Sequence, residues 1–455
     1  FDKFLKFIIV YLGGICVSLI IGLYTYPYYD LILDGPVTQI EKLPKVINIL
    51  SNFGIFIDEK ILTIIWMIQG RIKGALLEVL YTFGGVYMIY CWYHNNWRIA
   101  FDILIKAVLS SLVIIFGYCI IELFYLGGSE TAKNILTIIS PYFHYIEINH
   151  GWWPRLLQPG AIRSIFAEPS FFSIWAAFTL PFIWYKLINS NILKSKILFF
   201  IITVIFTALI FLTNSRTGVG LLCGEFVCLL AYTLWIHNKF IVRKFVLVSI
   251  CTIFAFVLSN YFINNFMTEK DISAEDYFKK NLTNIASVDA RSNGARYSTI
   301  YANVVIGLDN PILGVGKGLV PAYMPDYFPD FAENNREVQN WIKYQNEKGI
   351  LKMPIPSFCA YSLVFAESGV VGLLCYLFPA VFLIYNILKI LYRDKEKLEF
   401  AILLISLLGT LASGFSNTLN ITYCYWVLLG LGYAMCFGKE NDVKDNGDAG
   451  SRQEH

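Results

Sequence analysis

Residues 197–236 read ILFFIITVIFTALIFLTNSRTGVGLLCGEFVCLLAYTLWI, and this segment alone indicates the class of fold. It contains two apolar runs, 197–213 and 217–236, which are separated by the short polar stretch 214–216. The hydrocarbon core of a bilayer is roughly 30 Å thick and requires about 20 mainly apolar residues in a helix. The segment therefore predicts two membrane-spanning helices joined by a tight turn.

The composition of the whole chain agrees with a membrane protein. Of its 455 residues 56% are hydrophobic and only 15% are charged, whereas soluble globular proteins carry about 25% charged residues. This composition excludes a water-soluble enzyme and a disordered chain. The net charge of +3 is too small to indicate a nucleic-acid partner. The 10 cysteines form neither a Cys-x-x-Cys pair nor a cluster with zinc-ligand spacing, so we expect no disulfide and no metal site.

Ten apolar runs have the length of a membrane-spanning helix. They are residues 4–26, 75–93, 99–126, 169–188, 197–213, 217–236, 244–263, 359–388, 398–415 and 421–437. We predict an all-α polytopic membrane protein with 10 to 12 transmembrane helices. The stretch 27–73 is the least regular. Its apolar residues 61–68 are few and are flanked by charges, which favours an interfacial helix, although one or two further crossings remain possible.

Lysine and arginine residues in alternate short connections predict the orientation. Cytoplasmic loops are enriched in these residues, and they occur before the first run and in the loops at 189–196, 237–244 and 389–397. We therefore expect both termini on the cytoplasmic side. The predicted units are a helix bundle at 1–263, a long extracytoplasmic loop at 264–358, further spanning helices at 359–438 and a flexible tail at 439–455. Loops as long as 264–358 are usually functional.

The segment before the fourth run carries the first candidate site residues. It reads Arg163-Ser-Ile-Phe-Ala-Glu168-Pro169-Ser170, and Pro169 suits the first turn of a helix. Glu168 would then lie at the helix N-terminus, where its carboxylate is ionised and held in place. The alternative is a helix cap beside an interfacial anchor.

Three further arginines are predicted on the same side of the membrane. Arg216 lies in the turn between two runs, and Arg291 and Arg296 lie in the long loop. A single arginine at this level often extends to lipid headgroups, but four arginines on one face with Glu168 favour an anion site. Because guanidinium binds phosphate in a bidentate manner and does not lose its charge, we expect a lipid-linked pyrophosphate.

Several other residues are candidate substrate contacts. Ser215 adjoins Arg216, and Lys317 lies in a Gly-x-Gly-x-Gly run that allows close backbone approach or forms a plain turn. Tyr323 and Tyr327 belong to an aromatic and acidic stretch that suits carbohydrate or headgroups. His144 and His150 could supply a catalytic base or have structural roles; of these, His150 is included in the predicted substrate site.

Four motifs occur in the order that is typical of the O-antigen polymerase and ligase superfamily, which the chain resembles over residues 150–440. They are Phe166-x-Glu168-Pro169-Ser170, Asn214-Ser215-Arg216-Thr217-Gly218, Asn310-Pro311-x-x-Gly314-x-Gly316 and Ala366-Glu367-Ser-Gly369-x-x-Gly372. Arg296 and Gly307 also fit the Arg-x10-Gly pattern of polymerase outer loops, whereas the spacing after Arg163 does not.

The resemblance implies a C-type (GT-C) membrane glycosyltransferase of the bacterial inner membrane. Its active site would face the periplasm and act on undecaprenyl-pyrophosphate-linked oligosaccharides, without a cofactor and together with a chain-length regulator. Ligases of this superfamily usually carry His-Asn before the Glu-x-Gly motif, and this place reads Pro356-Ser357-Phe358-Cys359 here. The missing histidine favours a polymerase over a ligase. A flippase or another transporter is the further alternative.

The predicted roles follow from this reaction. Arg216, Arg291 and Arg296 would stabilise the charge that develops on the leaving pyrophosphate. Glu168 would act as the general base or hold one of these arginines in place. Arg163, Lys317, Ser215, Tyr323, Tyr327 and His150 are the predicted substrate-binding residues.

The sequence also predicts that the reaction needs no divalent metal, because it has no Asp-x-Asp motif. We expect EDTA to leave the rate of glycan chain growth unchanged in a reconstituted assay. Loss of chain growth in EDTA, restored by added Mg²⁺ or Mn²⁺, would contradict this expectation.

Overall fold

The computed structural model describes residues 2–35, 39–144, 155–236, 238–267 and 291–438, and this part of the chain is helical without a strand. The helices up to the first polar loop are α1 (Asp2–Tyr24), α2 (Tyr29–Leu33), α3 (Leu43–Asn52), α4 (Glu59–Val79), the π-helical turn η1 (Leu80–Gly84), α5 (Gly85–Tyr93), α6 (Trp97–Leu126) and α7 (Glu130–Phe143). Next come α8 (Pro169–Asn189), α9 (Leu193–Leu212), α10 (Arg216–Ile236) and α11 (Lys239–Asn265). The remainder comprises α13 (Arg291–Asp309), α14 (Val320–Tyr323), η3 (Met324–Tyr327), η4 (Asp330–Ala332), α15 (Arg336–Lys348), α16 (Ala360–Arg393), α17 (Leu398–Ser413), η5 (Leu419–Ile421) and α18 (Tyr423–Phe437).

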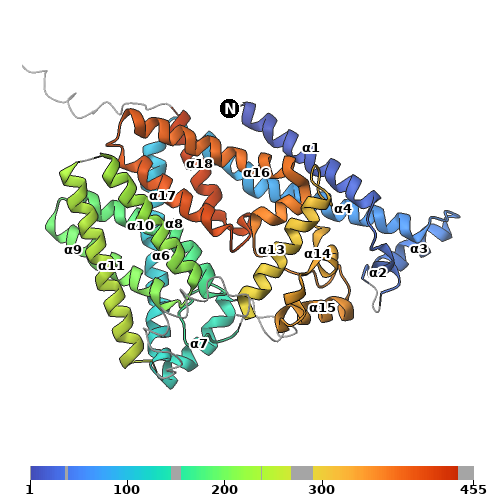
Figure 1. The fold of residues 1–455 in the computed structure, drawn as a ribbon, viewed down its shortest axis with the longest axis horizontal. Helices are drawn as coiled ribbons and strands as arrows, with labels where there is room; N and C mark the ends of the chain where they lie inside the picture. Colours follow the sequence, from blue (N-terminus) through green and yellow to red (C-terminus); the bar gives the residue numbers. More distant parts are fainter. Residues whose placement is uncertain (1, 36–38, 145–154, 237, 268–290, 439–455) are drawn as a thin grey trace, which may run out of the picture.

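The predicted fold class is confirmed. Within the described residues, 8 helical segments are long and apolar enough to cross a membrane, and α17 and α18 are shorter apolar helices. Each of the ten predicted runs corresponds to one of these ten elements. Figure 1 shows that α1 begins, and α18 ends, at one edge of the molecule, while α7 and α13 to α15 lie towards the opposite edge. The first and last spanning-length or apolar helices therefore have their outer ends at the same edge.

Residues 61–68, for which we expected an interfacial helix, are helical but do not form an element of their own. These residues belong to α4, which continues through η1 into α5 as one helical segment of 35 residues from Glu59 to Tyr93. Its N-terminus is capped by Asp58, whose side chain accepts a hydrogen bond from the Lys60 backbone N–H at 2.8 Å. A helix of this length extends roughly 50 Å, so its charged first half can extend beyond the bilayer core.

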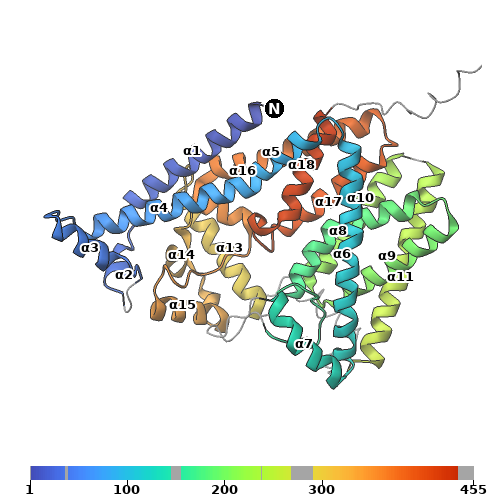
Figure 2. The same cartoon turned by 180° about the vertical axis from the view of Figure 1, so that it is seen from behind.

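Two hydrophobic cores organise the helices. The first joins α6, α8, α9, α10, α16, α17 and α18, and α8 is its most buried spanning helix, with Trp184 and Phe172 fully covered. The second joins the end of α1 and α2 to the long loop, for example through Leu19, Tyr26 and Val320. Figure 2 shows α1 and α4 running side by side along this second region. The long loop therefore packs on the N-terminal helices through a shared core.

Helix α16 is broken at Gly369, where φ is 63° and ψ is −166°. The loop that follows α13 fills this break. The Val315 and Gly316 N–H groups donate to the Ala366 and Glu367 carbonyls at 2.9 and 3.0 Å, and the Val370 N–H donates to the Pro311 carbonyl at 2.8 Å. Two of the sequence motifs thus meet at one junction and satisfy each other's backbone groups.

Replacing Gly369 with alanine should destabilise the protein. An added Cβ would lie 2.2 Å from the Ile312 carbonyl oxygen, and a left-handed backbone costs a non-glycine residue about 1 kcal/mol or more. We expect a lower thermal unfolding temperature in detergent.

The matched control is Gly70→Ala in α4, where an added Cβ meets no atom within 4 Å. It should leave stability unchanged or slightly raised, since alanine favours helix. Equal unfolding temperatures for the two variants would argue against strain at the break.

Candidate functional site

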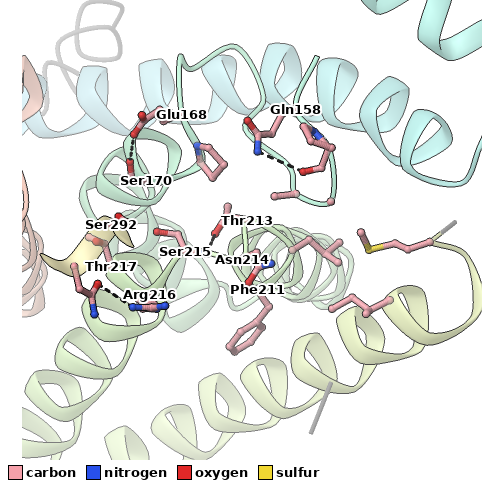
Figure 3. Close-up of a pocket in the computed structure, with 18 of the residues that line it drawn as sticks. Gln158, Glu168, Ser170, Phe211, Thr213, Asn214, Ser215, Arg216, Thr217 and Ser292 are labelled. Atoms are coloured by element: carbon pink, nitrogen blue, oxygen red, sulfur yellow. Dashed lines mark hydrogen bonds between the residues drawn. The ribbon is translucent and has the colours of Figure 1, made fainter. Parts of the chain in front are cut away.

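A cavity of about 620 Å³ lies where α8, α9, α10, α11 and α13 come together. Its lining comes from four parts of the chain that are distant in sequence. They are Gln158–Ala161 with Glu168–Ser170, the turn Phe211–Thr217, Ile263 with Met267, and Ser292, Asn293 and Arg296 of α13. Figure 3 shows the polar side chains of the first two parts on facing sides of the cavity. The predicted extracytoplasmic ends of these helices therefore form one pocket.

The turn between α9 and α10 fixes Arg216. Asn214 adopts a left-handed conformation, with φ of 54°, which reverses the chain between the two helices. The Ser215 hydroxyl then accepts a hydrogen bond from the Gly218 N–H at 3.2 Å and caps α10. Thr213 closes the turn by accepting from the Ser215 N–H at 3.2 Å. As a result, Arg216 is the first residue of α10 and lines the pocket.

Glu168 directly precedes Pro169, the first residue of α8, as the sequence predicted. Its side chain does not cap the helix. Instead, it accepts a hydrogen bond from the Ser170 hydroxyl at 3.0 Å and lines the pocket (Figure 3). The carboxylate is therefore fixed by a neighbouring hydroxyl group and faces the cavity, which weakens the alternative that it only caps the helix.

Arg216 and Arg296 come from different helices to the same pocket. The Arg216 guanidinium donates to the Asn293 side-chain oxygen at 2.8 Å, which links α10 to the first turn of α13. Arg296 lies one helical turn further along α13. It donates to the Ser416 carbonyl at 3.3 Å and stacks 5.2 Å from the centre of the Phe358 ring. Arg216 is thus held by another residue of the pocket lining, and Arg296 by contacts with Ser416 and Phe358, which are not among the lining residues.

The pocket has a positive character. Among the described residues of its lining, Arg216, Arg296 and Glu168 carry charge, so two guanidinium groups accompany one carboxylate. Burial lowers the pKa of Arg296, Glu168 and Glu337 raise it, and Arg216 lowers it. Arginine remains protonated at any physiological pH despite such shifts. The residual positive charge suits an anionic group.

One wall of the pocket is apolar. Phe211 at the end of α9, Ile263 near the end of α11 and Met267 beyond it form this side. The outward faces of α9 and α11 carry exposed apolar side chains such as Ile205 and Val257, as expected for helices in contact with lipid. The cavity lining is therefore amphipathic, because it combines charged groups with apolar side chains from two helices that expose apolar residues.

Arg163 does not line this pocket. Its side chain is only 1% exposed, and its guanidinium donates to the Leu156 and Ala167 carbonyls at 2.8 and 3.3 Å. Glu122 of α6 holds the same loop by accepting from the Ser164 and Arg163 N–H groups at 2.8 and 3.4 Å. Arg163 thus shapes the loop that leads to Glu168, and the structure gives it no access to a ligand in the cavity.

Lys317 lies apart from the pocket as well. Its ammonium group is 2.8 Å from Glu367 of α16 and 3.1 Å from Glu78 of α4. Burial alone would lower the pKa of Lys317, but the two carboxylates outweigh this effect and raise it. Lys317 is therefore part of a buried ion cluster and not of the pocket wall.

The remaining predicted residues are divided. Ser215 lines the pocket, whereas Tyr323 is buried in an aromatic cluster, 4.8 Å from the Tyr28 ring, and Tyr327 packs against the second core. Arg291 is the first residue of α13, but its side chain and the whole of His150 lie outside the described residues.

His144, the other candidate base, is buried beside Tyr118 and Ser140. Burial, together with Arg163, lowers the pKa of His144 to about 4. This environment describes a neutral structural histidine.

Sequence reasoning missed Asn293 and Gln158. Asn293 is three residues from Arg296 and thus on the same face of α13, a spacing that could have indicated a shared site. Gln158 lies in the loop before α8, and its amide donates weakly to the Pro159 carbonyl at 3.4 Å. No periodic sequence pattern marks Gln158, because its place at the pocket depends on how this loop folds.

A comparison with known families found one match. Residues 201–377 match a family model described as O-Antigen ligase, a region that is less than half of the chain. The matched region includes the α9–α10 turn, α13 and the first part of α16, whereas Glu168 lies before it. No curated protein and no solved structure matches the chain. The family match supports the resemblance to the O-antigen polymerase and ligase superfamily and does not distinguish the two activities.

The structure predicts different outcomes for Arg163 and a nearby exposed arginine. Arg163→Met should lower the thermal unfolding temperature, because it leaves two partly buried carbonyl groups without donors, at about 1–3 kcal/mol. Arg155→Met, at an exposed position of the same loop, is the control and should be neutral. Equal stability of the two variants in detergent would show that Arg163 does not hold the loop.

Proposed function

We propose that this chain is an O-antigen (surface polysaccharide) polymerase of the bacterial inner membrane. It would join undecaprenyl-pyrophosphate-linked oligosaccharide repeats on the periplasmic face, with both termini in the cytoplasm. The observation that carries the proposal is that Arg216 and Arg296, 80 residues apart in sequence, line one cavity with Glu168. The family match over residues 201–377 supports the general class of enzyme.

The chemistry of the pocket suits transfer from a lipid pyrophosphate. In the proposed reaction, a hydroxyl group of the incoming lipid-linked repeat attacks the anomeric carbon of the growing glycan. The new glycosidic bond forms as the bond to the pyrophosphate oxygen breaks, and the lipid pyrophosphate leaves with the electron pair. Arg216 and Arg296 would stabilise the negative charge that develops there, since fixed cations in a partly buried site act strongly on such charge.

Glu168 is the proposed acceptor of the hydroxyl proton. Within the part of the chain that the structure describes, it is the single carboxylate in the pocket lining, and the Ser170 hydroxyl orients it. A general base must lie within hydrogen-bond reach of the attacking hydroxyl group, and a glycan bound across the cavity could meet this condition. The second role, in which Glu168 holds Arg296 by charge attraction, is compatible with its effect on the pKa of Arg296.

The shape of the cavity suits a substrate with a lipid tail. The lining includes the apolar side chains of Phe211, Ile263 and Met267, and helices α9 and α11, which end at the pocket, carry exposed apolar side chains. A polyprenyl chain could remain in the bilayer while its pyrophosphate meets the arginines. A chain-length regulator is the proposed protein partner.

A ligase is the second candidate, because the matching family model carries that description. Such an enzyme would transfer the finished glycan to a lipid A core. Against it stands the segment Pro356–Cys359, which has no histidine before the Glu-x-Gly motif. Of the histidines in the described part of the chain, His94 and His144, neither lines the pocket.

Replacing Arg216 or Arg296 with alanine should abolish chain growth while the protein remains folded. Loss of one charge-stabilising donor reduces the rate by about 100- to 1,000-fold. In a system reconstituted with lipid-linked repeats, the variants should accumulate single repeats, and gel separation of the glycans reports their length.

Arg393→Ala, at the exposed far end of α16, is the matched control and should retain wild-type chain lengths. Wild-type chain lengths in both pocket variants would refute the proposed site. Addition of lipid A core to the purified protein tests the alternative, because glycan transfer to this acceptor would identify a ligase.

A further inference from the structure

Three charged residues from distant segments meet away from the pocket, and we call them the clamp: Glu78, Lys317 and Glu367. Glu78 ends α4, Lys317 lies in the loop after α13, and Glu367 lies in α16. The ammonium group of Lys317 is 2.8 Å from Glu367 and 3.1 Å from Glu78. The side chain of Lys317 is 15% exposed, that of Glu367 is 5% exposed and that of Glu78 is 29% exposed. Solvent therefore screens these contacts only weakly.

A hydrogen-bond network surrounds the clamp. The Gly318 N–H donates to Glu367 at 2.8 Å, so the carboxylate binds both the side chain and the backbone of the loop. The Asn420 amide donates to Glu78 at 2.8 Å and in turn accepts from the Tyr376 hydroxyl at 3.1 Å. The clamp thereby connects α4, α16, the loop after α13 and the segment before α18.

The clamp lies beside two irregularities in membrane helices. Glu78 is two residues before the π-helical turn η1, and Glu367 is two residues before the break at Gly369. Such turns within helices often occur at functional positions. Irregular backbone at membrane depth is tolerated only where its polar groups are satisfied. The clamp closes the junction at which the loop supplies hydrogen bonds to the broken helix α16.

The position of this loop determines the position of α13. Helix α13 lies along the first half of α16: Gly307 faces Phe365 so closely that a Cβ would lie 2.4 Å from the ring. The Asn303 amide donates to Ser357 and Ser362 at 3.2 and 3.3 Å. Because α13 is one continuous helix, fixing its end at Asp309 also fixes Arg296 near its start.

We propose that Glu78, Lys317 and Glu367 are positioning residues that hold α13 on the broken helix α16 and thereby place Arg296 in the pocket. This inference rests on the proposed function for its effect on catalysis. Lys317 then has a positioning role and not a role in substrate contact. The motifs at 310–316 and 366–372 would both serve to hold α13 on α16. Buried ion pairs often contribute little net stability compared with apolar groups, so the clamp serves the alignment of α13 more than the stability of the fold.

The test uses a variant that removes all three charges together, Glu78→Gln/Lys317→Met/Glu367→Gln. Removing one partner would leave an uncompensated buried charge and could unfold the protein, whereas the neutral triple variant avoids this problem. The first measurement is hydrogen exchange of the full-length protein, read in peptides that cover 291–309 and 311–318. We expect exchange at least about 10-fold faster there, with little change in α8 and α17.

The second measurement is the rate of glycan chain growth with lipid-linked repeats. We expect kcat to fall about 10- to 100-fold, because a displacement of about 1 Å at a catalytic group has an effect of this size. The KM for the lipid-linked donor should change less than kcat. The single variant Lys317→Arg retains the positive charge. Its hydrogen exchange and kcat should therefore be closer to those of the wild type than to those of the triple variant. The control is Lys352→Gln, which removes an exposed ion pair with Glu41 and should change neither.

Wild-type exchange in 291–309 together with wild-type kcat in the neutral triple variant would overturn the proposal. If that variant does not fold, Glu367→Asp is the second test, because it shortens the side chain by one methylene group. It should accelerate hydrogen exchange in α13 and lower kcat. Wild-type values of both would refute the proposed positioning role. Absence of glycan transfer in the wild-type protein would refute the proposed function, and the exchange measurement would still decide whether the clamp holds α13.

Discussion

The architecture depends on the need to satisfy every backbone polar group at membrane depth. Helix α16 breaks at Gly369, and an unsatisfied N–H or carbonyl group in hydrocarbon costs several kcal/mol. The loop after α13 removes this cost, because its own N–H and carbonyl groups pair with residues 366, 367 and 370. The loop after α13 is thereby tied firmly to a helix long and apolar enough to span a membrane. The helix that carries Arg296 ends at this rigid base.

The pocket gains its chemistry from the same arrangement. Helices α8 and α10 approach it from the first core and α13 from the second, and each contributes one charged group that is fixed by neighbours. Arg216 is held by Asn293, Arg296 by Ser416 and Phe358, and Glu168 by Ser170. Such pre-organised charges need little rearrangement when a reaction develops charge beside them. The amphipathic lining then suits a ligand that is part lipid and part anion.

The sequence could predict the spanning helices and the centre of the pocket. Long apolar runs identify membrane helices because lipid excludes other structures. Arg216 and Glu168 lie at the ends of such runs, so the number of predicted spans before each residue predicts its side of the membrane. Arg163 and Lys317 could not be assigned in the same way. Their partners, Glu122 and the pair Glu78 and Glu367, are far away in sequence, and a single sequence carries no signal for such pairs. The sequence predicts a helix at 61–68, but not its continuation through η1 into α5, since charged residues follow 61–68 within the same helix.

The direction of the helices at the pocket has one more consequence. Pro169 begins α8, Arg216 begins α10, and Ser292 and Asn293 belong to the first turn of α13, so three helices point their N-termini at the same cavity. The aligned peptide dipoles of a helix act as roughly half a positive charge at this end, and backbone N–H groups there bind anions readily. Part of the attraction of this cavity for an anionic group is therefore built into the main chain. It would persist in any sequence that preserves these three helix starts, which leaves the side chains of the lining free to diverge.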